Sequence, residues 1–303
     1  MSPANIFSGG GCCDLTVSYD NAADRWVLSY LFAPGVEVAV SDGPDPLNAN
    51  WFVYDFPQIS DYNKLSVWRD GYYITDNGPM DVWVLDRTAS LAGDPAAGIQ
   101  GFVVGGIVPP AGFGFTSAQV FNVTDDNLPT TGGAPLVYMR DDANTAITED
   151  AVWIYDINVD FANPANSNVA GPQEFPVTPF INVFDGGGFA NLTQPGGGSD
   201  IDAIQATIMN QAQFRKFPTH NSALFNFVID ADASAGELAA IRWYELRQDG
   251  DGMPWSIFQE GTFTAPDGRH AWMGSMVMDG QGNIGLGYSS MADQQLLIQQ
   301  ILE

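Results

Sequence analysis

The chain has 303 residues, and its 10 Lys and Arg against 36 Asp and Glu give a formal net charge of −26 at pH 7. A field of this sign repels a phosphate backbone, so the composition argues against nucleic acid and anionic membrane surfaces as partners. Apolar residues make up 45% of the sequence, enough for a large core, which excludes a disordered acidic tail. No apolar run approaches the roughly 18–20 residues that span a bilayer, so we expect no membrane insertion.

The start of the chain and its cysteines bear on cellular location. The first eleven residues, MSPANIFSGGG, have neither a basic start nor an apolar core, so we expect no signal peptide in this chain. Cys12 and Cys13 are adjacent and therefore do not tie distant segments together; they form either a vicinal disulfide or two free thiols. The acidic, lysine-poor composition suits a protein kept soluble in salty surroundings, and it favours a secreted or cell-surface location.

Five stretches share one outline, in which an apolar run leads into an Asp-led turn and a second apolar run follows. Short β runs separated by Asp, Gly and Asn turns predict antiparallel hairpins. A diverged repeat of such hairpins is typical of a β-propeller, so we predict an all-β propeller of about five to seven blades, with a β-sandwich as the competing fold. In chain order the stretches cover residues 15–32, 64–77, 135–161, 222–247 and 275–290, with turn acids Asp20, Asp70, Asp141, Asp230 and Asp279.

Two segments depart from this pattern and predict helices. Residues 200–213 and residues 291–303 both place apolar side chains at every third or fourth position, the first as a short insertion between blades and the second as a helical tail. The stretches rich in Gly and Pro read as surface loops rather than as linkers, so residues 1–303 are expected to form a single domain. These loop stretches are 105–114, 171–179 and 185–198.

Several motifs lie in the same order as in a known family. The chain carries DRWVLSYLF at 24–32, KLSVW at 64–68, RWYELR at 242–247 and WMGSMVMDGQGNIGLGYS at 272–289. Over residues 20–290 it resembles a family of secreted or cell-surface bacterial β-propeller proteins, mostly uncharacterised, with DRW, DYPKL, RWYELR and WMGSxxMDxxGNIxLGYS motifs. The resemblance implies a propeller fold and a secreted or cell-surface bacterial protein. It implies little about function, because members of the family are mostly uncharacterised and are often joined to adhesion or sorting modules.

The chain departs from that family at four places. Asn63 stands where the DYPKL motif has proline, and residues 215–222 replace a segment of the form RNFGxHES. Members of the family also have propeller sequence before DRW and a further conserved stretch after LGYS, whereas this chain ends in the helix-like tail. A short version of the fold would leave a sheet edge uncovered, so self-association as a structural unit of a larger assembly is one alternative.

Asp-rich turns are the candidates for a metal site, because Ca²⁺ prefers carboxylate and carbonyl oxygens. None of these turns has the bidentate Glu of a full twelve-residue calcium loop. The alternative is that each acid closes its own turn by accepting a hydrogen bond from the backbone two residues on. The candidate ligands for Ca²⁺, the one cofactor that the sequence leaves open, are Asp42, Asp45, Asp61, Asp249, Asp251 and Asp279.

A catalytic site for an acidic polysaccharide would need arginines to neutralise the charge of the sugar. It would also need a nucleophile or a base, which could be a Tyr–Glu pair or a loop histidine acting with Tyr62 or Tyr244. The alternative is that the arginines tie buried carboxylates and that the histidine is solvated. No GxSxG, HExxH, Walker or dinucleotide motif is present, and His270 is expected to pack beside Trp272. The candidates are His220, Tyr244, Glu245, Arg215, Arg242 and Arg269.

Aromatic residues alternate with polar ones along several predicted strands, and packing between blades accounts for most of them. Trp243, Tyr244 and Arg247 would instead bind a ligand if they lay at the mouth of the propeller. Taken together, the sequence predicts a non-catalytic recognition or adhesion propeller that binds a polysaccharide or a surface protein. The alternatives are a polysaccharide-degrading hydrolase or lyase, and a structural unit of an assembly.

Overall fold

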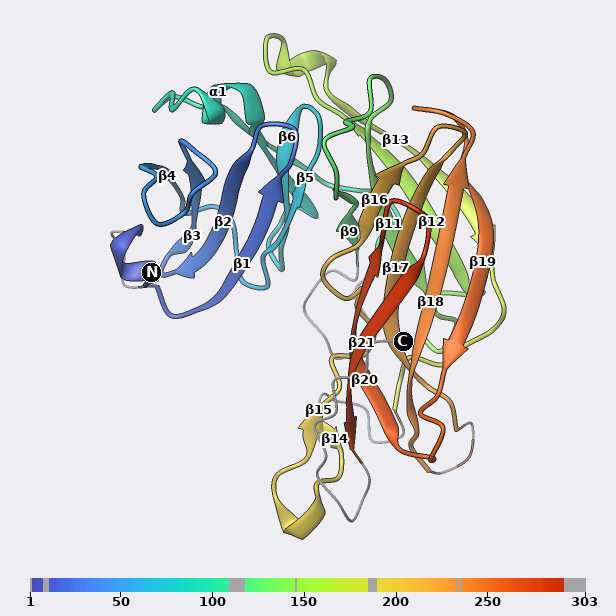
Figure 1. Ribbon diagram of the computed structural model, residues 1–303. Coiled ribbons are helices and arrows are strands. Elements are labelled where there is room, and N and C mark those ends of the chain that lie inside the picture. The colour runs from blue at the N-terminus through green and yellow to red at the C-terminus, as the bar shows by residue number, and fades with distance from the viewer. Residues whose placement is uncertain are drawn as a thin grey trace.

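The computed structural model describes residues 2–7, 11–108, 118–144, 146–184, 190–232, 234 and 236–291, and it is all-β with few and short helices (Figure 1). Sheet A contains β1 (Cys13–Asp20), β2 (Arg25–Phe32), β3 (Gly35–Ser41) and β4 (Trp51–Phe56). Sheet B contains β5 (Lys64–Val67), β6 (Gly71–Thr75), β7 (Val82–Asp86) and β8 (Ile99–Phe102).

The second half of the chain forms the remaining sheets. Sheet C contains β9 (Gln119–Val120), β11 (Ala134–Arg140), β12 (Ala151–Asn158) and β13 (Asn168–Pro176). Sheet D contains β10 (Asn122–Val123), β16 (Gln213–Lys216), β17 (Asn221–Asp230), β18 (Ala239–Gln248) and β19 (Ser256–Phe263). Sheet E pairs β14 (Ala190–Leu192) with β15 (Ile201–Asp202), and sheet F pairs β20 (His270–Met278) with β21 (Ile284–Met291).

The described residues contain four short helical turns, one before β1 and three between strands. The α-helix α1 (Arg87–Leu91) follows β7, and Asp86 caps it by accepting a hydrogen bond from Ala89 N at 3.1 Å. The other three are 3₁₀ turns, η1 (Pro3–Asn5), η2 (Pro164–Asn166) and η3 (Pro195–Gly197). In the described part of the chain, no helix is long and apolar enough to cross a membrane.

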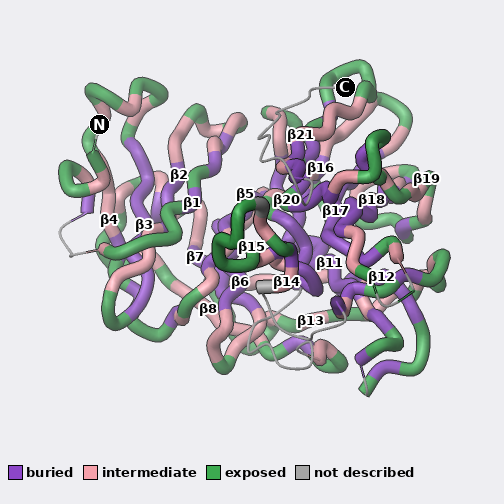
Figure 2. The backbone as a smooth tube through the Cα atoms, turned by 90° about the horizontal axis from the view of Figure 1, so that it is seen from below, coloured by how far each residue is buried: buried purple, intermediate pink, exposed green. Residues whose placement is uncertain are grey.

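The arrangement of the sheets is propeller-like: sheet A lies at one end of the molecule, sheet B follows it, and sheets C, D and F gather at the other side (Figure 2). Apolar side chains fill the space between successive sheets: one cluster joins A to B, a larger one joins B, C and D, and three smaller ones lie between D and the elements around F. Each inner face is buried because both neighbouring sheets present an apolar row to it. No described cluster joins sheet A to sheet F.

Side chains of the innermost strands tie sheets B, C and D together near the centre. Asn122, the first residue of β10 in sheet D, accepts a hydrogen bond from Val67 N of sheet B at 2.8 Å. Ser66 Oγ donates to Val120 O at 2.7 Å, and Gln119 Nε2 donates to Ile208 O at 2.7 Å. These buried side chains form hydrogen bonds with backbone groups of neighbouring elements, outside the ladders within each sheet. The bonds therefore fix the position of one sheet relative to the next.

All five predicted hairpins are present, with their acids at the turns. They are the pairs β1–β2, β5–β6, β11–β12, β17–β18 and β20–β21, each antiparallel. The all-β class and the propeller-like arrangement are therefore confirmed, but the count of five to seven blades is wrong. The described residues form four sheets of four or five strands, and the fifth hairpin stays a two-stranded sheet.

The predicted helix over residues 200–213 is also wrong. Asp202 accepts a hydrogen bond from Ile204 N at 2.7 Å, a local turn that competes with helix formation. Ile204 and Ala206 have φ angles of 49° and 64°, and Ile208 forms a β-bridge with Phe227. The helical spacing of apolar residues arises because this segment buries side chains against several elements in turn. The predicted C-terminal helix lies outside the described residues, apart from Met291 at the end of β21. Cys12 and Cys13 form a disulfide.

Candidate functional site

The predicted calcium ligands mostly close their own turns. Asp42 accepts hydrogen bonds from the backbone and side-chain nitrogens of Asn50 at 2.8 and 2.7 Å, and Asp45 accepts from Leu47 N at 3.0 Å. Asp279 accepts from Gln281 N at 2.8 Å in the same way. These contacts match the alternative in which each acid stabilises a turn, and they hold the pKa values of all three carboxyls below the usual range.

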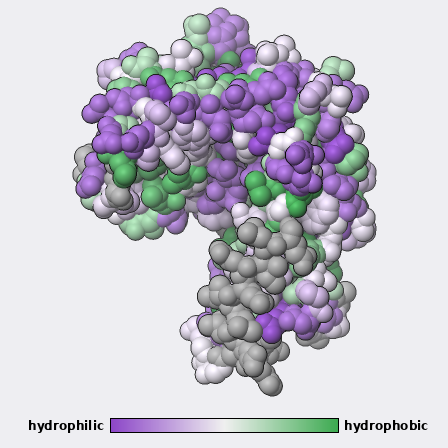
Figure 3. All heavy atoms as spheres, in the orientation of Figure 1, coloured by the Kyte–Doolittle hydropathy of each residue, from purple (hydrophilic) through white to green (hydrophobic). Residues whose placement is uncertain are grey.

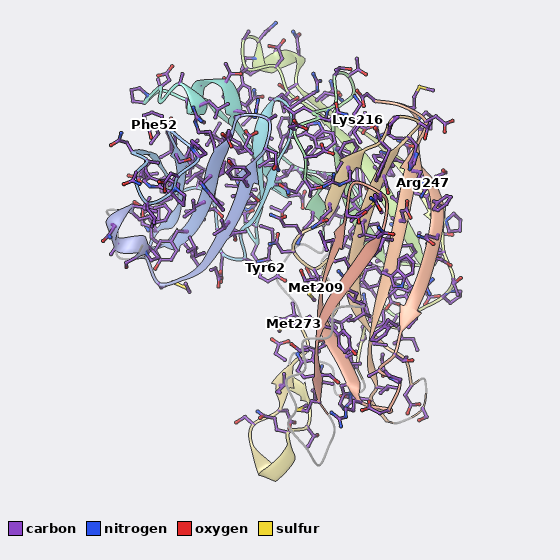
Figure 4. All side chains as sticks on the ribbon, viewed as in Figure 1. Phe52, Tyr62, Met209, Lys216, Arg247 and Met273 are labelled. Atoms are coloured by element: carbon purple, nitrogen blue, oxygen red, sulfur yellow. A yellow bond between two sulfur atoms is a disulfide. The ribbon has the colours of Figure 1, made fainter. Side chains whose placement is uncertain are left out.

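Asp251 has a different role, because it joins three segments. Its carboxylate accepts from Lys216 Nζ at 2.7 Å, from Thr130 N at 2.8 Å and from Asn221 Nδ2 at 3.0 Å. Burial opposes ionisation, but these hydrogen bonds outweigh it and lower the pKa of Asp251 to about 2. Lys216, near the upper end of sheet D in Figure 4, is therefore an internal counter-ion. Of the other two candidates, Asp61 accepts from Tyr62 N at 2.7 Å and Asp249 is exposed.

The described residues bring together one group of three acids, and it is not the predicted set. Carboxylate oxygens of Asp141, Asp142 and Asp150, at the end of the β11–β12 hairpin, lie within 4.8 Å of one another. Two of these acids already accept backbone hydrogen bonds, Asp141 from Asn182 N at 2.5 Å and Asp150 from Phe180 N at 2.8 Å. Burial and the two neighbouring acids raise the pKa of Asp141 to about 6, against the effect of its hydrogen bonds. The acid pairs flanking this loop in the sequence were the signal for the group.

Three of the predicted catalytic residues lie on β18 and divide between its two faces, because successive residues of a strand point to opposite sides. On the face toward sheet C, Arg242 binds Glu260 at 3.0 Å and Tyr244 Oη at 3.0 Å. Tyr244 is fully buried, and burial raises its pKa well above the usual range. This pair is a structural tie with no access to solvent for Tyr244.

The opposite face of β18 carries Trp243, Glu245 and Arg247. Glu245, 1% exposed, accepts hydrogen bonds from Arg247 Nε at 2.6 Å, Gln259 Nε2 at 2.7 Å and Ser222 Oγ at 2.8 Å. Three donors occupy this buried carboxylate, so it is suited to hold Arg247 in place. Arg247 lies over the exposed ring of Phe258, near the upper end of sheet D (Figure 4).

Of the other candidates, His220 lies close enough to Arg247 and Glu245 to feel their charges, whereas Arg215 and Arg269 form ion pairs of their own. His220 stacks on Phe217 with ring centroids 5.0 Å apart, and burial together with the charge of Arg247 lowers its pKa. Arg215 pairs with Asp125 at 3.5 Å, and Arg269 pairs with Asp267 at 2.7 Å. His270 is buried and accepts from Ala239 N at 3.2 Å, as a packed histidine would. The arginines therefore do not converge on one point.

An apolar surface that the sequence did not single out covers the outer face of sheet A. Along β1, Thr16 and Ser18 turn toward sheet B and donate hydrogen bonds to Asn63 O at 3.2 Å and Leu65 O at 3.4 Å. The intervening Leu15 and Val17 therefore point away from sheet B, and they are 40% and 45% exposed. Large apolar residues exposed at adjacent positions of one strand face are unusual for a soluble protein and mark an interaction surface.

Neighbouring strands extend this surface. Val17 pairs with Leu28 across the β1–β2 ladder, and Tyr19 pairs with Trp26, whose rings lie 4.8 Å apart. The Trp26 Nε1 group donates to Pro44 O at 2.8 Å, which holds the indole at the rim. In Figure 3, hydrophobic residues gather over this part of sheet A, beside the N-terminal turn.

A hollow of 190 Å³ lies on this outer face, and we call it the sheet A hollow. Strands β1, β2 and β4, the β3–β4 loop and the N-terminal turn all contribute to it. Its lining is Ser2, Pro3, Ile6, Leu15, Val17, Trp26, Leu28, Pro46 and Trp51. The one signal in the sequence was β2, whose run RWVLSYLF is apolar at nearly every position and therefore predicts a strand with apolar side chains on both faces.

Comparisons with known proteins assign no family to this chain. No protein-family model matches it, and no curated protein does. Among solved structures it is similar to an alpha-L-arabinofuranosidase from Lactobacillus brevis, with 13% sequence identity and a TM-score of 0.40, over 92% of this chain and 83% of that one. A similarity at this level transfers no activity, and the resemblance to secreted bacterial propellers stays a prediction.

Proposed function

We propose that this protein is a non-catalytic recognition module, secreted or displayed on a cell surface, and that it binds a partner protein through the sheet A hollow. The observation that carries the proposal is the hollow itself, an apolar depression flanked by the half-exposed side chains of Leu15 and Val17. Apolar depressions of this kind receive the anchor side chains that dominate protein–protein affinity. A volume of 190 Å³ suits one large side chain such as Leu, Met or Phe.

The lining favours a protein over a polysaccharide. A sugar presents hydroxyl groups, and a site that binds it needs several convergent polar partners. Ser2 is the single residue of the lining with a hydroxyl, and the Trp26 Nε1 group is already bonded to Pro44. Trp51 Nε1 is buried without a hydrogen-bond partner, so the aromatic faces rather than polar groups are offered to a ligand. The polysaccharide alternative therefore has less support at this surface.

The experiment is a screen of the purified protein against an array of short peptides, each with one large apolar residue in a varied context. Binding is followed by tryptophan fluorescence, because Trp26 and Trp51 line the hollow. Val17→Asp should lower the affinity of any selected peptide at least tenfold, because it places a charge beside an apolar contact. Val103→Asp, a substitution of another exposed apolar residue, is the matched control and should leave the affinity unchanged.

The same protein is tested against a panel of acidic and neutral polysaccharides with and without Ca²⁺. Retention on a polysaccharide that Val17→Asp does not affect would contradict a protein partner at the hollow. Release of new reducing ends, or of unsaturated sugars, would contradict a non-catalytic role and favour the hydrolase or lyase alternative. Peptide binding that both Asp variants reduce equally would place the site elsewhere.

A further inference from the structure

Arg247 has an unused hydrogen-bonding edge on the outer face of sheet D. Its Nε group donates to Glu245 at 2.6 Å, and its guanidinium lies over the ring of Phe258, 3.3 Å from the ring centroid. Among the described residues, no hydrogen bond or ion pair of Arg247 uses Nη1 or Nη2. The side chain is 31% exposed, so the guanidinium is within reach of a ligand from solvent.

Buried contacts fix the position of this guanidinium. Glu245, 1% exposed, also accepts hydrogen bonds from Gln259 Nε2 at 2.7 Å and from Ser222 Oγ at 2.8 Å. Ser222 is the direct neighbour of Arg247 in the β17–β18 ladder, so the same strand pair positions both groups. A guanidinium that is already held in place loses little conformational freedom when it binds a ligand, and this favours affinity.

A β-bulge between β18 and β19 brings the ring of Phe258 to the same face. In this ladder, Glu245 pairs with Gln259. The next pair is Leu246 with Ile257, so Phe258 between them has no partner across the ladder. An extra residue of this kind re-aims a side chain, and here it places Phe258 beside Gln259 on the outer side. Phe258 is 53% exposed, so much of its ring remains available.

His220 adds a second polar group near the guanidinium. Its ring stacks on Phe217 with centroids 5.0 Å apart, and burial together with the charge of Arg247 lowers its pKa. Thr219 Oγ1 lies 3.1 Å from Nδ1 of the ring. When the Thr219 hydroxyl donates to Nδ1, the neutral ring carries its proton on Nε2 and donates from there. The surface therefore combines a charged fork, a neutral donor and an exposed aromatic ring.

These three features together match a carboxylated sugar. The Nη1–Nη2 edge of an arginine fits the two oxygens of a carboxylate. The exposed ring of Phe258 can pack against the C–H face of a sugar ring, while Thr219 and Ser256 bring hydroxyl groups to the same surface. A net charge of −26 repels a polyanion, so one carboxylate on an otherwise neutral sugar chain is favoured.

We propose that Arg247, Phe258 and His220 bind a sugar that carries one carboxylate, such as a single hexuronic acid within a neutral polysaccharide. The carboxylate accepts two hydrogen bonds from Arg247, the sugar ring packs on Phe258, and His220 donates to a sugar hydroxyl. Figure 4 places Arg247 on the opposite side of the molecule from Phe52 of sheet A. The proposal is therefore independent of a protein partner at the sheet A hollow.

The probes are methyl β-D-glucuronide and methyl β-D-glucoside, which differ only in carrying a carboxylate or a hydroxymethyl group. NMR of the full chain follows the Nε–H signal of Arg247 and the backbone amides of residues 256–259. The glucuronide should shift these signals with a dissociation constant on the order of 1 mM, as expected for a ligand of this size. The glucoside should bind about tenfold more weakly, because it lacks the charge-assisted hydrogen bonds.

Two substitutions separate the fork from the ring. Arg247→Lys keeps the charge but loses the bidentate geometry, so it should weaken glucuronide binding about five- to tenfold and leave glucoside binding unchanged. Phe258→Ala removes an exposed ring and should weaken the binding of both sugars by the same factor, about two- to tenfold. Arg269→Lys, at an arginine that pairs with Asp267, is the matched control and should change neither affinity.

Three outcomes would overturn the proposal. The first is that neither sugar shifts the signals of Arg247 and residues 256–259 at concentrations well above the expected dissociation constant. The second is that both sugars bind equally tightly, or that Arg247→Lys and Arg269→Lys weaken the glucuronide alike. The third is that the capped peptide acetyl-glycyl-glutamyl-glycinamide binds more tightly than the glucuronide, which would make an acidic peptide the occupant.

Discussion

The hairpins β1–β2 and β20–β21 begin from the same sequence pattern and differ in what packs beside them. Asp20, at the turn of the first, is fully buried and binds Arg87, the first residue of α1, through two nitrogens at 2.6 and 2.9 Å. Tyr72 of sheet B donates to the same carboxylate at 3.0 Å. Asp279, at the turn of the last, is exposed and bonds only to its own loop, at Gln281 and Asn283. The turn chemistry is local in both, but only the first acid also joins two sheets.

The two faces of sheet A show the same difference at the level of packing. The face toward sheet B buries Val27, Val38 and Val40 completely, whereas the opposite face leaves Leu15 and Val17 half exposed. Both faces are apolar, so apolarity alone does not decide burial; a neighbouring sheet does. Four predictions test this contrast between covered and open elements.

The largest effect is expected at the covered hairpin. Asp20→Ala should lower the free energy of unfolding by about 3–5 kcal/mol, because it leaves the guanidinium of Arg87 partly buried without its counter-charge. Urea denaturation followed by fluorescence measures the change. The double variant Asp20→Leu with Arg87→Met removes both charges and should recover most of the loss. A single-variant loss under 1 kcal/mol would show that the pair does not hold sheets A and B together.

The pH dependence of stability tests Asp141, the acid at the turn of the β11–β12 hairpin. The folded-state pKa of Asp141, about 6, lies above the roughly 3.9 of an unfolded Asp, so the folded protein binds this proton more tightly. The stability contributed by Asp141 is then complete below about pH 4 and is lost as the pH rises through 6, an effect on the order of 2 kcal/mol. Urea midpoints between pH 4 and 7 should fall in the wild type and stay flatter in Asp141→Asn.

His220 titrates in an overlapping range, so His220→Gln is the control for this measurement. The His220→Gln variant should keep the fall in stability between pH 4 and 7 that Asp141 causes. Because the pKa of His220 is lowered in the folded protein, this histidine makes stability rise with pH, so its removal cannot abolish the decline. A decline that persists in Asp141→Asn would show that another group is responsible. Asp251 gives the opposite dependence, because its pKa of about 2 makes its stabilising contribution complete above pH 4 and lost as the pH falls toward 2.

The two faces of sheet A are compared directly by Val40→Ala and Val17→Ala. Val40 is fully buried, and removing two carbon atoms there should cost about 1.5–3 kcal/mol of unfolding free energy. Val17 is 45% exposed, so the same change should stay within about 0.5 kcal/mol. Equal losses would mean that the outer face is covered in solution, and light scattering of the wild type would then show whether a second copy covers it.

The sequence predicted the hairpins because their information is local: an apolar run, an Asp turn and a second run specify antiparallel pairing without reference to the rest of the chain. It failed at residues 200–213, where the spacing of Ile201, Ile204 and Ile208 reflects contacts with distant strands. It also missed the sheet A hollow, since periodicity identifies an apolar face but not whether another sheet lies against it. The predicted site residues were distributed by strand alternation, which separated Tyr244 from Glu245.

The smallest effect is expected at the open hairpin. Asp279→Ala removes the acceptor for the backbone amides of Gln281 and Asn283, but no neighbouring sheet depends on this exposed acid. The midpoint of urea denaturation should therefore not change measurably, while amide exchange at these two residues becomes faster because the turn opens more often. Asp42→Ala, which removes a similar exposed turn contact to Asn50, is the matched control and should behave alike. A large loss of global stability in Asp279→Ala alone would show that another element covers the β20–β21 turn in solution, as sheet B and α1 cover the β1–β2 turn.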